Sequence, residues 1–125
     1  MQRQPIADRT AKKRKAFARG WLAEHVAAAS LMLKGHRILA VRFKTRVGEI
    51  DLIAARGQRL AFIEVKQRPS REACQSAVSD RTRTRVRRAA DAWLATHVDR
   101  RDCDVHFDCV FVVPWRWPEH VEDAL

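Results

Sequence analysis

The sequence predicts a single α/β domain in which a mixed central sheet is flanked by helices. Three observations favour this fold. A helical pattern occupies the first third of the chain, three apolar strand patterns follow it, and a second helical pattern precedes a last apolar strand. The expected element order is therefore α-β-β-β-α-β. A chain of 125 residues is long enough to bury the core of one such domain.

The first helix is expected over residues 15–34. Its apolar residues recur at helical spacing, and Gly35 follows where a C-terminal cap belongs. The pattern consists of Phe17, Trp21, Ala28, Leu31 and Met32. A second apolar set on the other side of the helix consists of Leu22, Val26 and Leu33. Most of the helix surface is therefore expected to be buried.

Three strands are expected next, over residues 36–43, 47–54 and 60–66, because apolar residues with high strand propensity gather there. Gly57-Gln58 suits a two-residue type II′ turn between the second and third strands, since that turn favours glycine first.

A polar loop is expected over residues 67–79, and Ser79 or Asp80 then provides the N-cap of a second helix that runs to about residue 97. Residues 106–113 are strongly apolar and form the last predicted strand.

Two segments are expected to lie outside the folded domain of residues 15–113. Residues 1–14 are polar and basic, which is typical of a flexible arm. Residues 114–125 form an irregular tail that carries Trp115 and Trp117. These tryptophans are suited to stacking on unpaired bases. Packing of the tail onto the core or a partner is the interpretation that we favour.

The formal net charge is +10, and most of the basic residues are arginine. Such an excess favours a polyanionic partner, which is DNA or RNA rather than an anionic membrane. A basic protein without such a partner is the alternative. The three cysteines form no CxxC pair, which indicates reduced thiols and a cytoplasmic location. The sequence contains no apolar run of membrane-spanning length, so no membrane association is expected.

Acidic residues interrupt the second and third strands. The predicted turn gives three cross-strand pairs, which are Ile53–Phe62, Asp51–Glu64 and Glu49–Lys66. Side chains alternate along a strand, so one exposed face is expected to carry Glu49, Asp51, Glu64 and Lys66. The opposite, core-facing side is expected to carry Ile50, Leu52, Ala54, Ile63 and Val65.

Two opposed carboxylates repel each other unless a cation lies between them. Mg²⁺ or Mn²⁺ prefers oxygen ligands, so Asp51 and Glu64 are candidate metal ligands, and the backbone carbonyl of Val65 could add a third. Lys66 could then hold, or help to deprotonate, a water that attacks a phosphodiester. The alternative is a solvated hairpin face with an ordinary ion pair between Glu49 and Lys66.

Glu24 falls within the apolar stripe of the first helix. A carboxylate there must be paired, protonated or bound to a metal. If this helix crosses the sheet near the hairpin, Glu24 becomes a third acid at the cation. The alternative is a glutamate at the rim of the stripe that extends to solvent or pairs with an arginine.

The second helix places Arg81, Arg85 and Arg88 on one face. Its apolar side carries Val86, Ala89, Ala90 and Trp93. Like charges four residues apart destabilise a helix unless an anion is near, so this face is a candidate contact for phosphates. A solvated arginine face is the alternative. Arg46 and Arg68 are further candidate contacts to nucleic acid.

Four segments together are similar to one known family. They are Gly-x-x-x-Glu at 20–24, Gly-His-Arg-Ile-Leu at 35–39, Val-Gly-Glu-Ile-Asp-Leu-Ile at 47–53 and Phe-Ile-Glu-Val-Lys-Gln-Arg at 62–68. The chain resembles the YraN-like family, whose members are assigned as endonucleases by similarity. That family is similar to the PD-(D/E)xK restriction-endonuclease-like superfamily, near the archaeal Holliday-junction resolvases. The likeness is close over residues 20–68 and looser as far as Asp108.

The resemblance implies a restriction-endonuclease-like core with a metal site. Asp51 and Glu64 would bind the metal, Lys66 would be the catalytic lysine, and Glu24 would be the acid on the helix. Glu49 and Gln67 match the motif and are further candidates. The proline in the superfamily name is replaced by Ile50, as in YraN-like relatives.

The function expected from these observations is a Mg²⁺- or Mn²⁺-dependent endonuclease that hydrolyses phosphodiester bonds in DNA, with branched DNA as one candidate substrate. Two alternatives remain open. One is a non-catalytic nucleic-acid-binding protein that retains the nuclease fold, and the other is a scaffold protein. Resolvases of the superfamily dimerise, so the resemblance leaves a homodimer as one expected arrangement.

Overall fold

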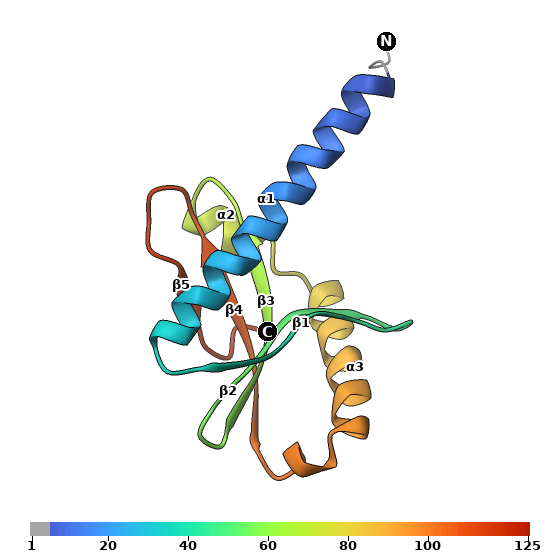
Figure 1. Cartoon of the computed structure of the whole chain (residues 1–125), viewed down its shortest axis with the longest axis vertical. Coiled ribbons are helices and arrows are strands. Elements are labelled where there is room, and N and C mark those ends of the chain that lie inside the picture. The colour runs from blue at the N-terminus through green and yellow to red at the C-terminus, as the bar shows by residue number, and fades with distance from the viewer. Residues whose placement is uncertain (1–5) are drawn as a thin grey trace.

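The computed structural model describes the backbone of residues 6–125, and the side chains of Arg14 and of residues 20–125. A long helix comes first, three strands follow, and two helices lead to the last two strands (Figure 1). The helices are α1 (Ile6–Leu33), α2 (Arg71–Ser76) and α3 (Asp80–Thr96), with a short 3₁₀ helix at Val98–Arg100. The strands are β1 (Arg37–Lys44), β2 (Glu49–Arg56), β3 (Arg59–Gln67), β4 (Asp104–Val112) and β5 (Glu119–Val121).

The strands form one mixed sheet in the order β1-β2-β3-β4-β5. Neighbours pair antiparallel except β3 and β4, which are parallel. A parallel pair needs a long crossover connection, and the segment with α2 and α3 provides it. The predicted α/β fold with a mixed central sheet and flanking helices is therefore confirmed.

Helices cover both faces of the sheet, with α1 on one side and α3 on the other (Figure 1). The core under α1 consists of Ala27, Leu31, Leu52, Ala54, Ala61, Ile63 and Val110. The core under α3 includes Ile50, Ile53, Phe62, Val86, Ala90, Trp93 and Phe111. One face of the β2–β3 hairpin was expected to be exposed, and that expectation is wrong. Ile53 and Phe62 on that face are fully buried, because α3 packs against them.

Helix α1 differs from the expected helix in its start and in its buried surface. It begins at Ile6, so its backbone includes residues 6–14, and its N-terminal half projects beyond the sheet (Figure 1). The side chain of Phe17 lies outside the described residues. Among the side chains of α1 that are described, the buried ones form a narrow stripe of Ala23, Ala27, Ser30 and Leu31, because the sheet covers one side of the helix. Large apolar side chains exposed in the same part of the helix are Trp21, Leu22, Val26, Met32 and Leu33.

The turn between β2 and β3 forms as predicted. Gly57 has a φ of +59°, and Arg56 pairs with Arg59 around the two-residue loop. A positive φ at the first loop position is the feature that requires glycine in a type II′ turn. The predicted pairing of Ile53 with Phe62 is present, but the ladder ends one residue further on, at Leu52 and Ile63. Asp51 and Glu64 therefore lie where the two strands have stopped pairing.

The sheet is also irregular on the β1 side of Asp51. Val41 pairs with Leu52 and Phe43 pairs with Ile50, so Arg42 is the residue opposite Asp51. Arg42 has a φ of +53°, which is uncommon for a residue other than glycine. Ile50 was expected on the same face as Leu52, but it packs in the core under α3, whereas Leu52 packs under α1. The strict alternation of β2 is therefore broken at Asp51.

The remaining differences lie in the segments that were expected to be irregular. Helix α2 forms within the expected loop, and Ser70 caps it by accepting a hydrogen bond from the Ala73 N–H. Ser79 caps α3 through the Thr82 N–H, as one of the two expected caps. The tail contributes β5 to the sheet. Its tryptophans do not pack on the core, since Trp115 is fully exposed and Trp117 is 66% exposed. The expectation that they pack on the core is wrong, whereas packing on a partner stays a prediction.

None of the helices in the described part of the chain is long and apolar enough to cross a bilayer. The three cysteine thiols are free, as expected, and Cys74 and Cys109 are buried. Burial raises the pKa of the Cys109 thiol to about 12, which makes it unreactive at neutral pH.

Candidate active site

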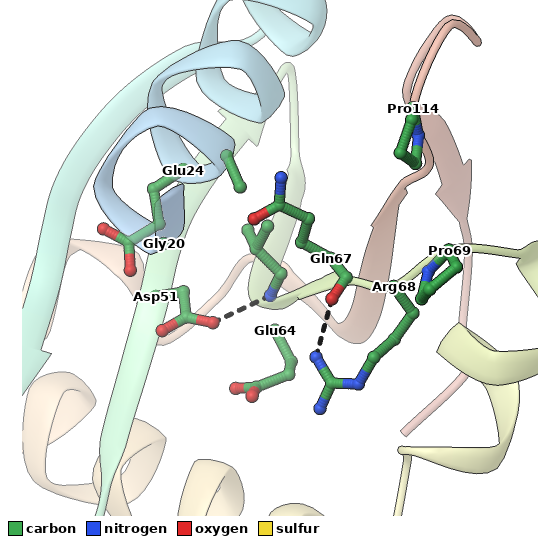
Figure 2. Close-up of a pocket in the computed structure, with 10 residues that line it drawn as sticks. Gly20, Glu24, Asp51, Glu64, Gln67, Arg68, Pro69 and Pro114 are labelled. Carbon is green, nitrogen blue, oxygen red and sulfur yellow. Dashed lines mark hydrogen bonds between the residues drawn. The ribbon is translucent and has the colours of Figure 1, made fainter. Parts of the chain in front are cut away.

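A pocket of about 660 Å³ opens where β2 and β3 separate beneath α1. We call it the acid pocket, because three carboxylates from three elements line it: Glu24 from α1, Asp51 from β2 and Glu64 from β3. Pro69 and Pro114 lie across the pocket from Glu24 and Asp51 (Figure 2). The remaining lining residues are Gly20, Ala23, Val65, Gln67 and Arg68.

Asp51 is the central carboxylate of the pocket. Its Oδ2 accepts a hydrogen bond of 2.8 Å from the backbone N–H of Val65 (Figure 2). This bond replaces the ladder hydrogen bonds that end one residue earlier, and it holds the side chain between the strands. Burial, and next the charge of Glu64 and that of Glu24, raise the pKa of Asp51 to about 8, against the opposing effect of the Val65 N–H. The surroundings of Asp51 therefore disfavour its charged form.

Glu24 reaches the pocket from the buried side of α1, and its side chain is only 12% exposed. The Nε of Arg42 donates a hydrogen bond of 2.5 Å to its Oε2. Both expectations for Glu24 thus describe part of its environment, since it lines the acid pocket and also pairs with an arginine. A buried carboxylate requires such a partner.

Glu64 and Lys66 form an ion pair, with 3.0 Å between Oε1 and Nζ, and both side chains are about 15% exposed. They lie two residues apart on β3, so alternation puts them on the same face. The expected pair between Glu49 and Lys66 is wrong. Glu49 instead lies 3.6 Å from Arg85 on α3, because β2 and β3 have separated before they reach these positions.

The carbonyl group of Val65 also faces the acid pocket side of β3. In a strand, the N–H and C=O of one residue point to the same neighbour, and the Val65 N–H points to Asp51. Its carbonyl oxygen is therefore directed into the same gap. Gln67 also lines the pocket, and it lies two residues further along β3.

The donor set of the acid pocket suits a hard divalent cation. It offers carboxylate oxygens from three elements and a backbone carbonyl, which are the ligands that Mg²⁺ and Mn²⁺ prefer. The raised pKa of Asp51 supports this fit, since a bound cation would favour the charged carboxylate that burial and the charges of Glu64 and Glu24 disfavour.

A second candidate metal site lies outside the acid pocket. Among the described residues, His106, Asp108 and Asp123 form the one trio whose potential ligand atoms all lie within 4.8 Å of one another. Glu24, Asp51 and Glu64 are spread more widely, because Arg42 and Lys66 hold two of them. Asp108 is fully buried, and Arg59 already donates to both of its oxygens, at 2.6 and 3.0 Å. The trio is therefore part of a structural ion network.

A second hollow, of about 500 Å³, separates the β1–β2 turn from α3. We call it the basic groove, and its charged lining residues are Lys44, Arg46, Glu49, Arg81, Arg85 and Arg88. The expected arginine face of α3 is confirmed, since these arginines lie opposite the buried Val86 and Ala90. At Gly48 the backbone of the β1–β2 turn approaches α3 closely, since an added Cβ would lie 2.0 Å from the backbone oxygen of Arg85. No other residue allows so close an approach.

The acid pocket and the basic groove are connected by a smaller hollow of about 280 Å³. It shares Gly20, Glu24 and Asp51 with the acid pocket and shares Lys44 and Glu49 with the basic groove. A continuous concave surface therefore runs from the arginines of α3 to the three carboxylates.

The structure divides the expected nucleic-acid contacts between these two hollows. Arg46, Arg81, Arg85 and Arg88 line the basic groove, whereas Arg68 lies at the acid pocket. Sequence reasoning missed Arg42, which holds Glu24. Counting back from the β1–β2 turn would have placed it opposite Asp51. It also missed Pro69 and Pro114, for which the sequence offers no signal.

The family model described as Uncharacterised protein family UPF0102 matches residues 23–112 of the chain. The chain belongs to the UPF0102 family. The matched segment contains all four charged residues of the candidate site, from Glu24 to Lys66.

Curated relatives carry the same family name. A UPF0102 protein of Rhizobium meliloti is 50% identical over 113 residues, which cover 90% of this chain and 93% of that protein. One from Mesorhizobium japonicum is 50% identical over 115 residues, covering 92% of each chain. One from Brucella canis is 52% identical over 116 residues, covering 93% of this chain and 92% of the relative.

Without divalent cations, the free energy of unfolding is expected to fall as pH rises from about 4 to about 8. The folded protein keeps a proton on Asp51 up to about pH 8, whereas the unfolded chain releases it near pH 3.8. The contribution of protonated Asp51 to stability is complete below the pKa that Asp51 has in the unfolded chain. It is lost as the pH rises through the pKa that Asp51 has in the folded protein. Asp51→Asn should remove that part of the slope in urea unfolding followed by circular dichroism. An unchanged slope would contradict the raised pKa.

Proposed function

We propose that this UPF0102 protein is a metal-dependent nuclease that hydrolyses phosphodiester bonds in DNA. One observation carries the proposal. A partly buried aspartate, whose pKa is raised to about 8, shares a pocket with two further carboxylates, close to a groove lined by arginines. A carboxylate cluster of this kind is costly unless it binds a cation, and the adjoining arginines are suited to a polyanion.

In this proposal, residues that line the acid pocket bind the metal, and Lys66, the ion-pair partner of Glu64, has a second role. Asp51, Glu64 and the Val65 carbonyl would hold Mg²⁺ or Mn²⁺, with Glu24 as a further acid. Such a cation supplies a lowered water pKa and stabilises negative charge on the phosphate. Lys66, held by Glu64 at 3.0 Å, orients the attacking water through its ammonium group.

The resemblance to the YraN-like family and the PD-(D/E)xK superfamily supports the same proposal, because Asp51, Glu64 and Lys66 occupy the positions of that motif. The arrangement around them agrees with the resemblance. The two acids lie where paired strands separate, and a helix brings a third acid to them. The finer assignment to that superfamily is part of the proposal.

The test is a cleavage panel with the full chain. Linear duplex, flap, fork and four-way-junction DNA, and the matching RNA strands, are incubated with Mg²⁺, with Mn²⁺ or with EDTA, and products are resolved on denaturing gels. Cleavage that requires the divalent cation supports the proposal. Cleavage of none of the substrates under any of these conditions would contradict it.

The basic groove is expected to set the affinity for DNA rather than the chemistry. In the double variant Arg81→Gln/Arg88→Gln, two phosphate contacts are lost, so the slope of log affinity against log salt should become shallower by about 2 on duplex DNA. Fluorescence anisotropy across a salt series measures this slope. Arg37→Gln, which removes an exposed arginine at the other end of β1, is the matched control. Equal slopes for the double variant and wild type would exclude the groove.

A non-catalytic nucleic-acid-binding protein is the second candidate. The observation that favours it is the pairing of Glu24 with Arg42 and of Glu64 with Lys66, since the chain itself offsets part of the acid charge. This candidate predicts salt-dependent DNA binding that is indifferent to Mn²⁺. A rise in melting temperature with millimolar Mn²⁺ that is absent in Asp51→Asn would exclude it.

A further inference from the structure

The loop between β4 and β5, residues 113–118, presents two tryptophans to solvent, and we call it the tryptophan loop. Trp115 is fully exposed, and Trp117 is 66% exposed. An exposed indole forgoes the large stabilisation that burial of an aromatic ring provides. These two indoles therefore contribute little to the stability of the core.

The exposure is imposed by an ordered backbone. The Arg116 N–H donates a hydrogen bond of 3.2 Å to the Val113 carbonyl, and Pro118 is buried. Strand β5 then ties the end of the loop back to β4. Trp115 has a φ of +64°, a left-handed conformation that is rare for a bulky residue. The loop thus holds the indoles away from the core.

The tryptophan loop begins at the rim of the acid pocket. Pro114, which immediately precedes Trp115, lines that pocket together with Arg68 and Pro69. These three residues lie on the side opposite Glu24 and Asp51 (Figure 2). The smaller hollow that adjoins the basic groove meets the acid pocket at Glu24 and Asp51, so the tryptophan loop begins on the side of the pocket away from the arginines of α3.

We propose that Trp115 and Trp117 stack on unpaired bases of a DNA strand that crosses the acid pocket. This inference rests on the proposed function for what happens in the pocket, and it specifies the substrate class. The substrate contains a single-stranded segment, such as a flap, an overhang or a free strand. Aromatic rings bind such segments because every exposed base offers a π-face, whereas the bases of intact duplex are already stacked on each other.

The positive charge around the exposed tryptophans favours nucleic acid, rather than another ligand, as their binding partner. Arg116 lies between the two tryptophans and is exposed, and Arg68 lies on the pocket rim. Arginines interleaved with aromatic rings can contact the phosphates on either side of a stacked base. The net charge of +10 favours the same polyanion.

The experiment measures binding by fluorescence anisotropy in EDTA, so that cleavage does not interfere. The probes are a 20-nucleotide oligo-dT strand, a blunt duplex and the same duplex with a single-stranded tail. Trp115→Ala and Trp117→Ala should each weaken binding of the single strand and the tailed duplex by about 5- to 150-fold. Binding of the blunt duplex should be unchanged, and Trp115→Phe should recover most of the loss, because phenylalanine retains a stacking face.

Leu33→Ala is the matched control, since it removes another exposed apolar side chain, at the end of α1, and should alter none of the three affinities. All variants change exposed positions, and circular dichroism checks that each is folded. Wild-type affinity for the single strand in both alanine variants would overturn the inference and leave the loop as a surface for another occupant, such as a protein. An equal loss for the blunt duplex would overturn it as well.

The outcomes separate this inference from the proposed function. If Asp51→Asn abolishes metal-dependent cleavage but the tryptophan variants bind single strands normally, only the inference fails. If the tryptophan variants lose single-strand binding but neither wild type nor any variant cleaves DNA with either metal, the base-stacking inference is supported and the nuclease proposal fails.

Discussion

Asp51→Asn is expected to abolish metal-dependent cleavage while DNA binding remains. Asparagine can still accept the hydrogen bond from the Val65 N–H, so the strands should keep their arrangement. It removes the carboxylate that Asp51 would offer to a cation in exchange for its proton, and with it the main reason for a cation to bind. Loss of the cation's stabilisation of the transition state, on the order of 4 kcal/mol, predicts a decrease of roughly a thousandfold in the cleavage rate.

The same variant should become at least as stable as wild type in the absence of metal. Once the pH passes about 8, wild-type Asp51 must ionise in a site where burial and the charges of Glu64 and Glu24 disfavour the carboxylate, whereas asparagine stays neutral. Opposite effects on activity and stability are typical of a residue kept for function. Single-turnover cleavage and thermal unfolding measure the two effects.

Glu64→Gln should give the same loss of cleavage, whereas Asp102→Asn is the matched control, because it removes an exposed carboxylate from the loop before β4. Cleavage by Asp51→Asn at the wild-type rate would show that the hydrolytic activity resides elsewhere. Cleavage that fell in Asp102→Asn to the same extent would show that net charge, rather than the pocket, is responsible.

Asp108→Ala is expected to lower the free energy of unfolding by about 3–5 kcal/mol, which is a large part of the stability of a small domain. The carboxylate is fully buried on β4, accepts two bonds from Arg59 and lies 2.8 Å from the His120 Nε2. It also accepts the Asp123 N–H, so it fastens the C-terminal segment to the sheet. Alanine leaves these donors buried without an acceptor. Urea denaturation measures the loss.

Two further variants distinguish the buried ion network from a simple cavity. Asp104→Asn changes an exposed carboxylate beside the same network and should shift stability by less than about 0.5 kcal/mol. Arg59→Met/Asp108→Leu replaces both partners by apolar side chains and should recover much of the lost stability. A double variant no more stable than Asp108→Ala would contradict this explanation.

The pKa of Asp108 also gives the pH direction of this contribution. The bonds from His120 and Arg59 lower that pKa below its ordinary value, despite the opposing effect of burial. The stability that Asp108 supplies is therefore present above the unfolded pKa and is lost as pH falls through the folded one. The Asp108→Ala penalty should shrink on acidification, in the opposite direction to the Asp51 contribution.

Much of the fold was predictable because local patterns and tertiary packing agree. Strands β1 to β4 lie within two residues of their predicted bounds, and Gly57 forms the predicted turn. Ser79 caps α3, and the helix buries its expected apolar side. In each case the pattern is set by residues close together in the chain, such as a glycine that allows a positive φ or an apolar stripe.

The errors arose where distant residues decide the outcome. The acidic face of the hairpin was expected to be exposed, but α3 covers its neighbours Ile53 and Phe62. The pairing of Glu49 with Lys66 assumed that the β2–β3 ladder continues, whereas it ends at Leu52 and Ile63. Stripe residues such as Trp21 and Met32 are exposed, because α1 contacts the sheet along a narrower line.

The sequence by itself determined which residue types are available for the site and on which strands they stand: two acids and a lysine on β2 and β3, a glutamate on the first helix, and arginines along α3. Only the tertiary structure decided that the three acids and the arginines line adjoining hollows, that Lys66 pairs with Glu64, and that both tryptophans after Pro114 are exposed. The physical reason is that local propensity and alternation act over a few residues. The separation of β2 from β3, the left-handed Arg42 and the approach of Gly48 to α3 depend on packing between elements.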